Sequence, residues 1–191
     1  MTSVPDPRPA LLLVDVIKAF FDPRGAFHYP EAAKVLPVIE RLLAAARDGG
    51  RLVVHARESH HPGLTDFEER KLPRHCVAGE FDAEFAPGFE PASNETEVRK
   101  RRYSAFFATD LALLLAEQAV GQVLVVGVKT NVCIRASVQD AFAHGFAPVL
   151  VRGASNSNRH NLHDAALEDV ARYFGEVIEV DEGVARLRGR A

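Results

Sequence analysis

The segment VLVVGVKTNVCIRASVQDAFAHGF, Val123 to Phe146, contains the joint on which the fold and the chemistry of this chain depend. It begins with an apolar run that is typical of a strand buried on both faces. From Asn131 onward it has the spacing of a helix. A single cysteine, Cys133, stands at the joint. This order of strand, turn and helix predicts one unit of a parallel α/β sheet, with Cys133 in the first helical turn.

The rest of the chain repeats this alternation. Strands are predicted at 10–15, 51–56, 96–100, 122–127, 147–153 and 176–180. Helices are predicted at 31–50, 104–120, 131–145 and 161–175, with Thr109 or Asp110 as an alternative start of the second. The irregular stretch 57–93 is expected to be a long loop region at the active site. Strands alternating with helices indicate a three-layer α/β/α fold, with helices on both faces of a parallel sheet and right-handed crossovers.

The composition of the chain argues against several classes of protein. The chain has 191 residues, 47% of them hydrophobic, and a formal net charge of -3. This balance argues against a nucleic-acid partner. No apolar run approaches the ~20 residues of a membrane span, and MTSVPDPRPA at the start lacks the apolar core of a signal peptide. The two cysteines, Cys76 and Cys133, form no CxxC pair. We therefore expect a cytoplasmic protein with reduced thiols and no membrane partner.

Three reactive side chains are expected at one edge of the sheet, because ligands of such sheets bind at the carboxyl ends of the strands. Asp15 and Lys100 end two predicted strands, and Cys133 follows a third. The helix start and the Lys100 ammonium are expected to lower the pKa of the Cys133 thiol. Asp15 is placed to move protons, and N–H groups of GVKTNVC are placed to hold an oxyanion. These are the parts needed for attack on an amide carbonyl through a thioester.

Each of these residues also has a structural interpretation, and the residues alone leave both open. A lone cysteine in a helix is often a small buried hydrophobe. An aspartate at a strand end, such as Asp15, often caps a turn or helix. Lys100 lies within RKRR, which suits a solvated charge run.

The motifs resemble those of the isochorismatase-like cysteine hydrolases, which include nicotinamidases, N-carbamoylsarcosine amidases and ureidoacrylate amidohydrolases. LLLVDVIKAFF is similar to the motif of the catalytic aspartate (Asp15), KRRYSAFFATDL to that of the lysine (Lys100), and VVGVKTNVCIRASVQDAFAHGF to that of the nucleophile (Cys133). RHCVAGEFDAEFAP resembles a further family segment. The resemblance covers about residues 10–180 and implies one domain over 1–191.

The resemblance also implies details of fold and site. It implies a six-stranded, mostly parallel sheet of Rossmann-like topology and a cis peptide bond at Val128–Lys129. It implies an oxyanion hole at Val128, Lys129 and Cys133, and an assembly of two or four copies. Phe20 and Tyr103 are candidates for the wall of the substrate pocket. The expected partner is a small amide or ureido compound.

Two departures from the family pattern affect the predicted substrate. Family members commonly carry a glutamine where this chain has Ile17. Nicotinamidases hold a metal with an Asp-x-His pair and later histidines, and the counterparts here are Glu58, His60, Asp66 and His75. Because glutamate is longer than aspartate and Asp66 replaces an imidazole, we expect a solvated polar loop and no cofactor, with a zinc or iron site as the alternative.

Three functions remain open from the sequence. The first is hydrolysis of a C–N bond by Cys133. The second is vinyl-ether hydrolysis of the isochorismatase type, which relies on Asp15 and requires no thiolate. The third is non-catalytic binding of a small molecule on the same fold. The substrate is not named by the sequence, although Arg101 or Arg102 is a candidate partner for a substrate carboxylate.

Overall fold

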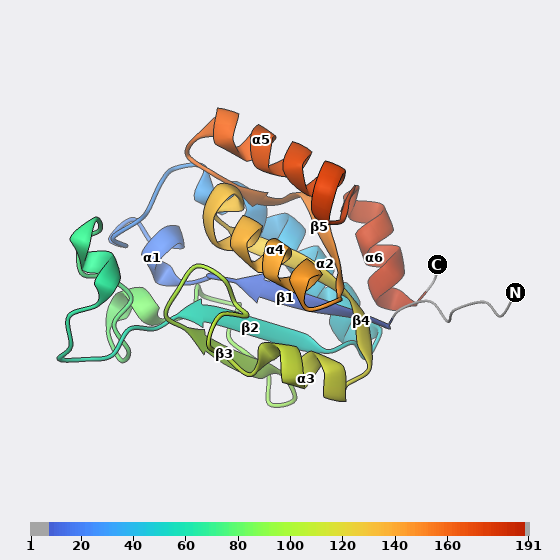
Figure 1. Ribbon diagram of the computed structural model, residues 1–191, viewed down its shortest axis with the longest axis horizontal. Coiled ribbons are helices and arrows are strands. Elements are labelled where there is room, and N and C mark those ends of the chain that lie inside the picture. Colours follow the sequence, from blue (N-terminus) through green and yellow to red (C-terminus); the bar gives the residue numbers. More distant parts are fainter. Residues whose placement is uncertain (1–7, 190–191) are drawn as a thin grey trace, which may run out of the picture.

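The computed structural model describes residues 8–189 and contains a six-stranded sheet between two layers of helices (Figure 1). Every strand pair in it is parallel, and the spatial order is β3-β2-β1-β4-β5-β6. The strands are β1 (Arg8–Val14), β2 (Val53–Glu58), β3 (Thr96–Lys100), β4 (Val120–Val128), β5 (Ala147–Asn156) and β6 (Glu176–Ile178). This is the order of the doubly wound dinucleotide-binding sheets, so the predicted fold class is confirmed.

The helices connect these strands. They are α1 (Lys18–Phe21), α2 (Leu36–Asp48), α3 (Leu111–Glu117), α4 (Arg135–Ala143), α5 (His160–Asp169) and α6 (Val180–Arg188). Short 3₁₀ or π turns are η1 (Ala32–Val35), η2 (Phe67–Arg70), η3 (Phe81–Ala83), η4 (Thr130–Ile134) and η5 (Val170–Phe174). The sequence did not predict α1 or α6. Over residues 8–189, the helices are too short or too polar for any of them to cross a membrane.

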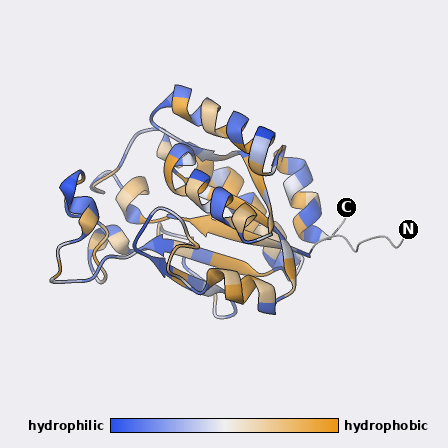
Figure 2. Cartoon of the chain, viewed as in Figure 1, coloured by the Kyte–Doolittle hydropathy of each residue, from blue (hydrophilic) through white to orange (hydrophobic). Residues whose placement is uncertain are grey.

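The sheet separates two hydrophobic cores. Leu11 and Leu13 of β1 face the core beneath α2 and α6, whereas Leu12 and Val14 face the core beneath α3 and α4. Because both faces are covered, β1 is apolar from Pro9 to Val14, as the hydrophobic colour of the central strands shows (Figure 2). This two-sided burial explains why the apolar runs of the sequence locate the central strands.

The helix predicted over 104–120 is shorter than expected. The observed α3 begins at Leu111, after Asp110. The preceding loop makes tertiary contacts instead of helical ones, because Ala105 N–H donates to Ser137 Oγ at 2.9 Å. Ala108 has a φ of +54°, which a right-handed helix does not allow. The alternative start at Asp110 is therefore the correct one.

Gly127 permits the close pairing of β1 and β4 next to their carboxyl ends. It is paired with Val14 and has a φ of +119°. A Cβ atom at this position would lie 2.0 Å from the carbonyl oxygen of Val14. Only glycine fits there, so the backbone can bring the end of β4 against the end of β1.

Gly127→Ala is expected to lower the free energy of unfolding by more than about 3 kcal/mol, because it adds both backbone strain and a clash with Val14. Gly145→Ala is the matched control, since Gly145 has a φ of +85° but no atom within 4 Å of its Cβ position. Its loss should stay near about 1–2 kcal/mol. Urea unfolding of both variants measures the difference, and equal losses would contradict the close-approach argument.

Candidate active site

The carboxyl ends of three strands, β1, β3 and β4, bring the three predicted reactive residues together. Lys100, at the end of β3, is fully buried. Its Nζ lies 2.8 Å from Asp15 Oδ2 and 3.7 Å from Cys133 Sγ. Lys100 is therefore in contact with the other two side chains. Although it lies within the RKRR run, it is a buried ion-pair partner and not part of a solvated face.

The Asp15 carboxylate is held from two sides. Its backbone adopts a φ of +54°, and its N–H donates to the carbonyl of Ala56 at 2.8 Å. Its Oδ1 accepts the N–H of Glu58 at 2.8 Å, and its Oδ2 faces Lys100. Asp15 and Cys133 also act on each other's pKa, so the carboxylate lies near the sulfur. These contacts fix the orientation of Asp15 toward the sulfur.

Burial and neighbouring charges determine the protonation states of Asp15, Lys100 and Cys133. Burial raises the pKa of the Cys133 thiol well above its usual value, and the nearby Lys100 ammonium does not offset burial together with Asp15 and Glu58. The prediction of a lowered pKa for Cys133 is therefore wrong, because the sulfur is buried and faces two carboxylates. Burial also raises the pKa of Asp15, which makes it a stronger base. Lys100 stays charged: burial opposes its charge, but Asp15, Cys133 and Glu58 raise its pKa.

The turn between β4 and α4 has the predicted backbone. The Val128–Lys129 peptide bond is cis. The carbonyl of Lys129 accepts hydrogen bonds from the N–H groups of Val132 at 3.0 Å and Ile134 at 3.2 Å. Both residues belong to the π turn η4. The first N–H groups of a helix have no acceptor within it, so this turn offers donors beside Cys133.

Two side chains that the sequence analysis did not single out support this turn. Ser137 Oγ donates to the carbonyl of Cys133 at 2.7 Å and accepts from Ala105, so it ties the loop after Lys100 to the helix of the cysteine. Its position four residues after Cys133, on the same helix face, was the available signal. His163 of α5 is partly buried, with its Nδ1 2.9 Å from Thr130 Oγ1.

The two predicted wall residues occupy different places. Phe20 is 5% exposed and packs into the core beside Lys129. Tyr103 is 42% exposed. Partial burial and the charges of Glu68 and Cys133 raise the pKa of Tyr103, so its hydroxyl lies within electrostatic range of the sulfur. Phe20 is therefore an inner residue and Tyr103 a rim residue.

A cluster of acidic and imidazole side chains lies next to Lys100. Glu58, His60, Glu68 and His75 each offer one atom, and these atoms lie within 4.8 Å of one another. Glu58 Oε1, His60 Nε2, His75 Nε2 and both Glu68 oxygens are buried without a hydrogen-bond partner among the described residues. Two imidazoles and two carboxylates are a donor set that fits a zinc-like divalent cation.

This cluster corrects the metal set expected from the sequence at one position. Asp66 is not in it, because Arg101 Nη2 and Arg102 Nη1 contact its two oxygens at 3.0 and 2.9 Å. Glu68 takes its place. Asp66 Oδ2 instead lies 3.1 Å from His60 Nδ1, where it orients the ring. The expected solvated polar loop is also wrong, since Glu58, His60, Glu68 and His75 are all buried.

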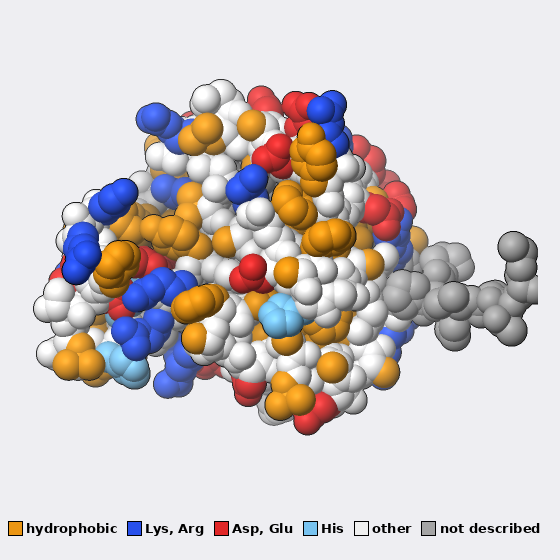
Figure 3. Space-filling view, viewed as in Figure 1, with side chains coloured by type: hydrophobic (Ala, Val, Ile, Leu, Met, Phe, Trp, Pro, Cys, Tyr) orange, Lys and Arg blue, Asp and Glu red, His pale blue; other side chains and the backbone are white. Residues whose placement is uncertain are grey.

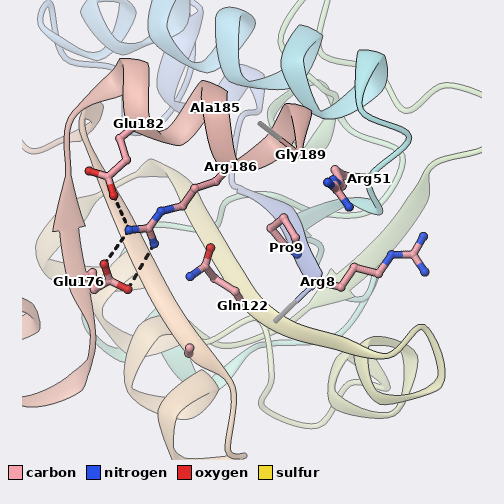
Figure 4. A pocket seen from close by; sticks show the side chains of 10 residues that line it. Arg8, Pro9, Arg51, Gln122, Glu176, Glu182, Ala185, Arg186 and Gly189 are labelled. Atoms are coloured by element: carbon pink, nitrogen blue, oxygen red, sulfur yellow. Dashed lines mark hydrogen bonds and ion pairs between the residues drawn. The ribbon is translucent and has the colours of Figure 1, made fainter. Parts of the chain in front are cut away.

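Among the hollows in the described part of the chain, two that lie away from Cys133 are lined by charged side chains. One is at the amino ends of the strands, lined by residues such as Arg8, Gln122 and Arg186, and Arg186 is paired there with Glu176 and Glu182 (Figure 4). The other is lined by His61, Arg99, Arg101, Arg102, Phe107 and Ala108, in a region where Figure 3 shows Lys and Arg side chains gathered beside hydrophobic ones. Neither contains a residue of the Asp15–Lys100–Cys133 group.

Comparisons with known proteins identify the family of this chain. The chain matches the Isochorismatase domain over residues 9–182. A maleamate amidohydrolase of Pseudomonas putida is 35% identical over 186 residues, which are 95% of this chain and 87% of that protein. An N-carbamoylsarcosine amidase of Arthrobacter is 29% identical over 188 residues, which are 94% of this chain and 71% of that protein. The solved pyrazinamidase of Pyrococcus horikoshii in complex with zinc has a TM-score of 0.83 and 31% identity, and the match covers 91% of this chain and 99% of that one. The chain therefore belongs to the isochorismatase family.

Proposed function

We propose that this chain is a cysteine-dependent amidohydrolase that cleaves a C–N bond of a small amide or ureido compound through a thioester. The observation that carries the proposal is the fully buried Lys100, whose ammonium contacts both the Asp15 carboxylate and the Cys133 sulfur. A buried lysine held between a base and a thiol suits activation of a nucleophile. Related proteins are named for hydrolysis of maleamate and of N-carbamoylsarcosine, which supports this reaction class.

The first half of the reaction forms the thioester. Cys133 Sγ attacks the carbonyl carbon, and its proton passes to Asp15, whose raised pKa suits a base. Lys100 remains charged and balances the negative charge that stays within the group. Backbone N–H groups at Lys129 and Cys133 hold the oxygen of the tetrahedral intermediate. Asp15 then returns the proton to the leaving nitrogen, and the C–N bond breaks.

The second half releases the acid. A water molecule attacks the thioester carbonyl and gives a proton to Asp15. The C–S bond then breaks, and the sulfur takes the proton back from Asp15. The products are a carboxylate or carbamate and ammonia or an amine. Because the resting thiol of Cys133 is neutral, the nucleophile forms only as the proton moves to Asp15.

The metal cluster is a separate feature in this proposal. Glu58, His60, Glu68 and His75 would hold a divalent ion, which would supply a Lewis acid to a ligand atom near the cysteine. Cleavage of a linear amide is proposed to need no cofactor, since Asp15, Lys100 and Cys133 supply the nucleophile, the proton transfer and the charge balance.

Two further parts of the proposal concern the setting of the enzyme. A reducing compartment such as the cytoplasm suits a free thiol at Cys133. We also propose a homodimer or homotetramer of this one-domain chain. Phe142 and Tyr173 are 53% and 61% exposed, and each packs its ring against Phe174, which forms an aromatic surface suited to burial between copies.

Cys133→Ala is expected to reduce ammonia release from small amides and ureido acids roughly ten-thousand-fold or more, because no other nucleophile lies beside Asp15 in the mechanism. The measurement compares steady-state release by native and variant protein across one substrate panel. Cys76→Ala is the matched control, because Cys76 is the second buried free cysteine and should leave most turnover intact. Retained turnover in Cys133→Ala would contradict the mechanism.

Asp15→Asn separates the amide reaction from vinyl-ether hydrolysis. In the amide reaction it should reduce turnover about a thousand-fold, in parallel with Cys133→Ala, because the base is lost. Assays with a vinyl ether such as isochorismate are run on both variants. A chain that hydrolyses the vinyl ether, loses this activity in Asp15→Asn and keeps it in Cys133→Ala would favour the alternative reaction.

Metal binding is tested by the zinc content of protein that has been incubated with zinc and then exchanged into metal-free buffer. Native protein should keep about one ion per chain, and His75→Ala should keep little. His61→Ala is the control, because His61 is exposed and lies outside the cluster. Turnover of a linear amide should change less than about twofold after chelation. Loss of turnover on chelation with recovery on added zinc would show that the metal is required.

A further inference from the structure

Lys129 is a cation beside the proposed nucleophile. It directly follows β4 and precedes Cys133 by four residues. Its side chain is half-buried, and its Nζ lies 5.0 Å from the ring centre of Tyr29 and 5.9 Å from that of Phe20. A thiolate at Cys133 would raise the pKa of this ammonium, so the side chain lies within electrostatic range of the sulfur.

This ammonium has no carboxylate partner in the described residues. Lys18 and Lys100 each contact a carboxylate, from Glu84 and Asp15, whereas Lys129 makes no such contact over residues 8–189. Burial lowers the pKa of Lys129, which shows that removing its charge from water is not compensated within the protein. A half-buried cation without a counter-ion beside reactive groups is typical of a ligand-binding position.

The aromatic wall that holds Lys129 is itself fixed. Tyr29 is 4% exposed, and its hydroxyl donates to Asn156 Oδ1 at 2.6 Å. Asn156 Nδ2 in turn donates to the carbonyl of Glu31 at 2.6 Å. These bonds hold the Tyr29 ring in place, so the ammonium faces a preorganised surface that can also contact an apolar part of a ligand.

The other basic candidates near the site are already paired. Arg101 and Arg102, which the sequence suggested for a substrate carboxylate, both contact Asp66. Lys100 is enclosed by Asp15, Glu58 and Cys133. Lys129 is therefore the better candidate for pairing with an anionic substrate, and one ammonium matches one negative charge.

We propose that Lys129 binds a carboxylate of the substrate, so that the preferred substrates are small amides or ureido compounds that carry a free carboxylate. This inference rests on the proposed amidohydrolase function and deepens it, because it names the substrate class and a residue that selects it. The carboxylate lies against the Lys129 ammonium while the amide carbon lies at Cys133 Sγ. The ionic contact is charge-assisted, and it is favoured by the partial exclusion of water.

The first experiment measures selectivity between maleamate and the cis isomer of crotonamide, in which a methyl group replaces the carboxylate. Lys129→Met keeps the aliphatic stem and removes the charge. It should lower the ratio of kcat/KM for maleamate to that for cis-crotonamide by about fifty-fold or more. Lys129→Arg should restore part of this ratio. Lys34→Met, at an exposed position in η1, is the control and should leave the ratio unchanged.

The second experiment measures binding without turnover, by calorimetric titration of maleamate into Cys133→Ala protein with and without Lys129→Met. The affinity should fall at least tenfold when the charge is removed. An unchanged affinity or an unchanged selectivity ratio would overturn the role of Lys129 while leaving an active amidohydrolase in place. A native chain that binds maleamate through Lys129 but releases no ammonia from any amide would instead reject the proposed function and support the carboxylate site.

Discussion

The arrangement of the candidate active site depends on one buried ammonium, that of Lys100. Lys100 lies at the end of β3 without access to water, and it is neutralised by Asp15 and by the nearby Glu58 carboxylate. Leaving one partner of a buried ion pair unpaired typically costs about 3–5 kcal/mol. The strand order therefore has a strict electrostatic requirement, because β1, β2 and β3 must end at the same level to bring these charges together. Gly127 also contributes to this arrangement. It lets β4 approach β1 closely enough to place Cys133 beside Asp15 and Lys100.

The electrostatic interactions of Lys100 extend through Glu58 to His60 and His75. Burial opposes the charge on Glu58, but Lys100, His60 and His75 hold its pKa well below the usual value. His75 is affected in the opposite sense: burial disfavours its charge, yet Glu58 and Glu68 raise its pKa to about 10. Glu58 thus belongs to two groups at once, the Asp15–Lys100–Cys133 group and the candidate metal cluster. Its backbone N–H fixes Asp15, while its carboxylate faces the imidazoles.

Much of this arrangement could be predicted from the sequence, and the exceptions have physical causes. The strands were predictable because burial on both faces leaves β1 and β4 almost wholly apolar. Asp15, Lys100 and Cys133 could be brought together because the carboxyl ends of parallel strands meet at one edge. The predicted helix start at residue 104 was wrong because Ala105 forms a hydrogen bond with Ser137, 32 residues away along the chain. The local sequence pattern does not reveal such a contact. Glu68, the protonation of Cys133 and the direction of the Lys129 side chain depend on burial and loop geometry, which no spacing rule supplies.

The neutral state of the buried Cys133 thiol has a consequence for survival of the enzyme under oxidants. Peroxides attack thiolates, and damage increases with thiolate character and with exposure. Cys133 is 3% exposed, and its raised pKa keeps the thiol protonated at rest. Its reactivity toward peroxides is therefore low until a substrate binds. A cysteine with a permanently low pKa would be ready for catalysis at all times, but it would also be open to sulfenic and sulfinic acid formation. In this protein, burial keeps Cys133, the proposed nucleophile, in a form that resists oxidation.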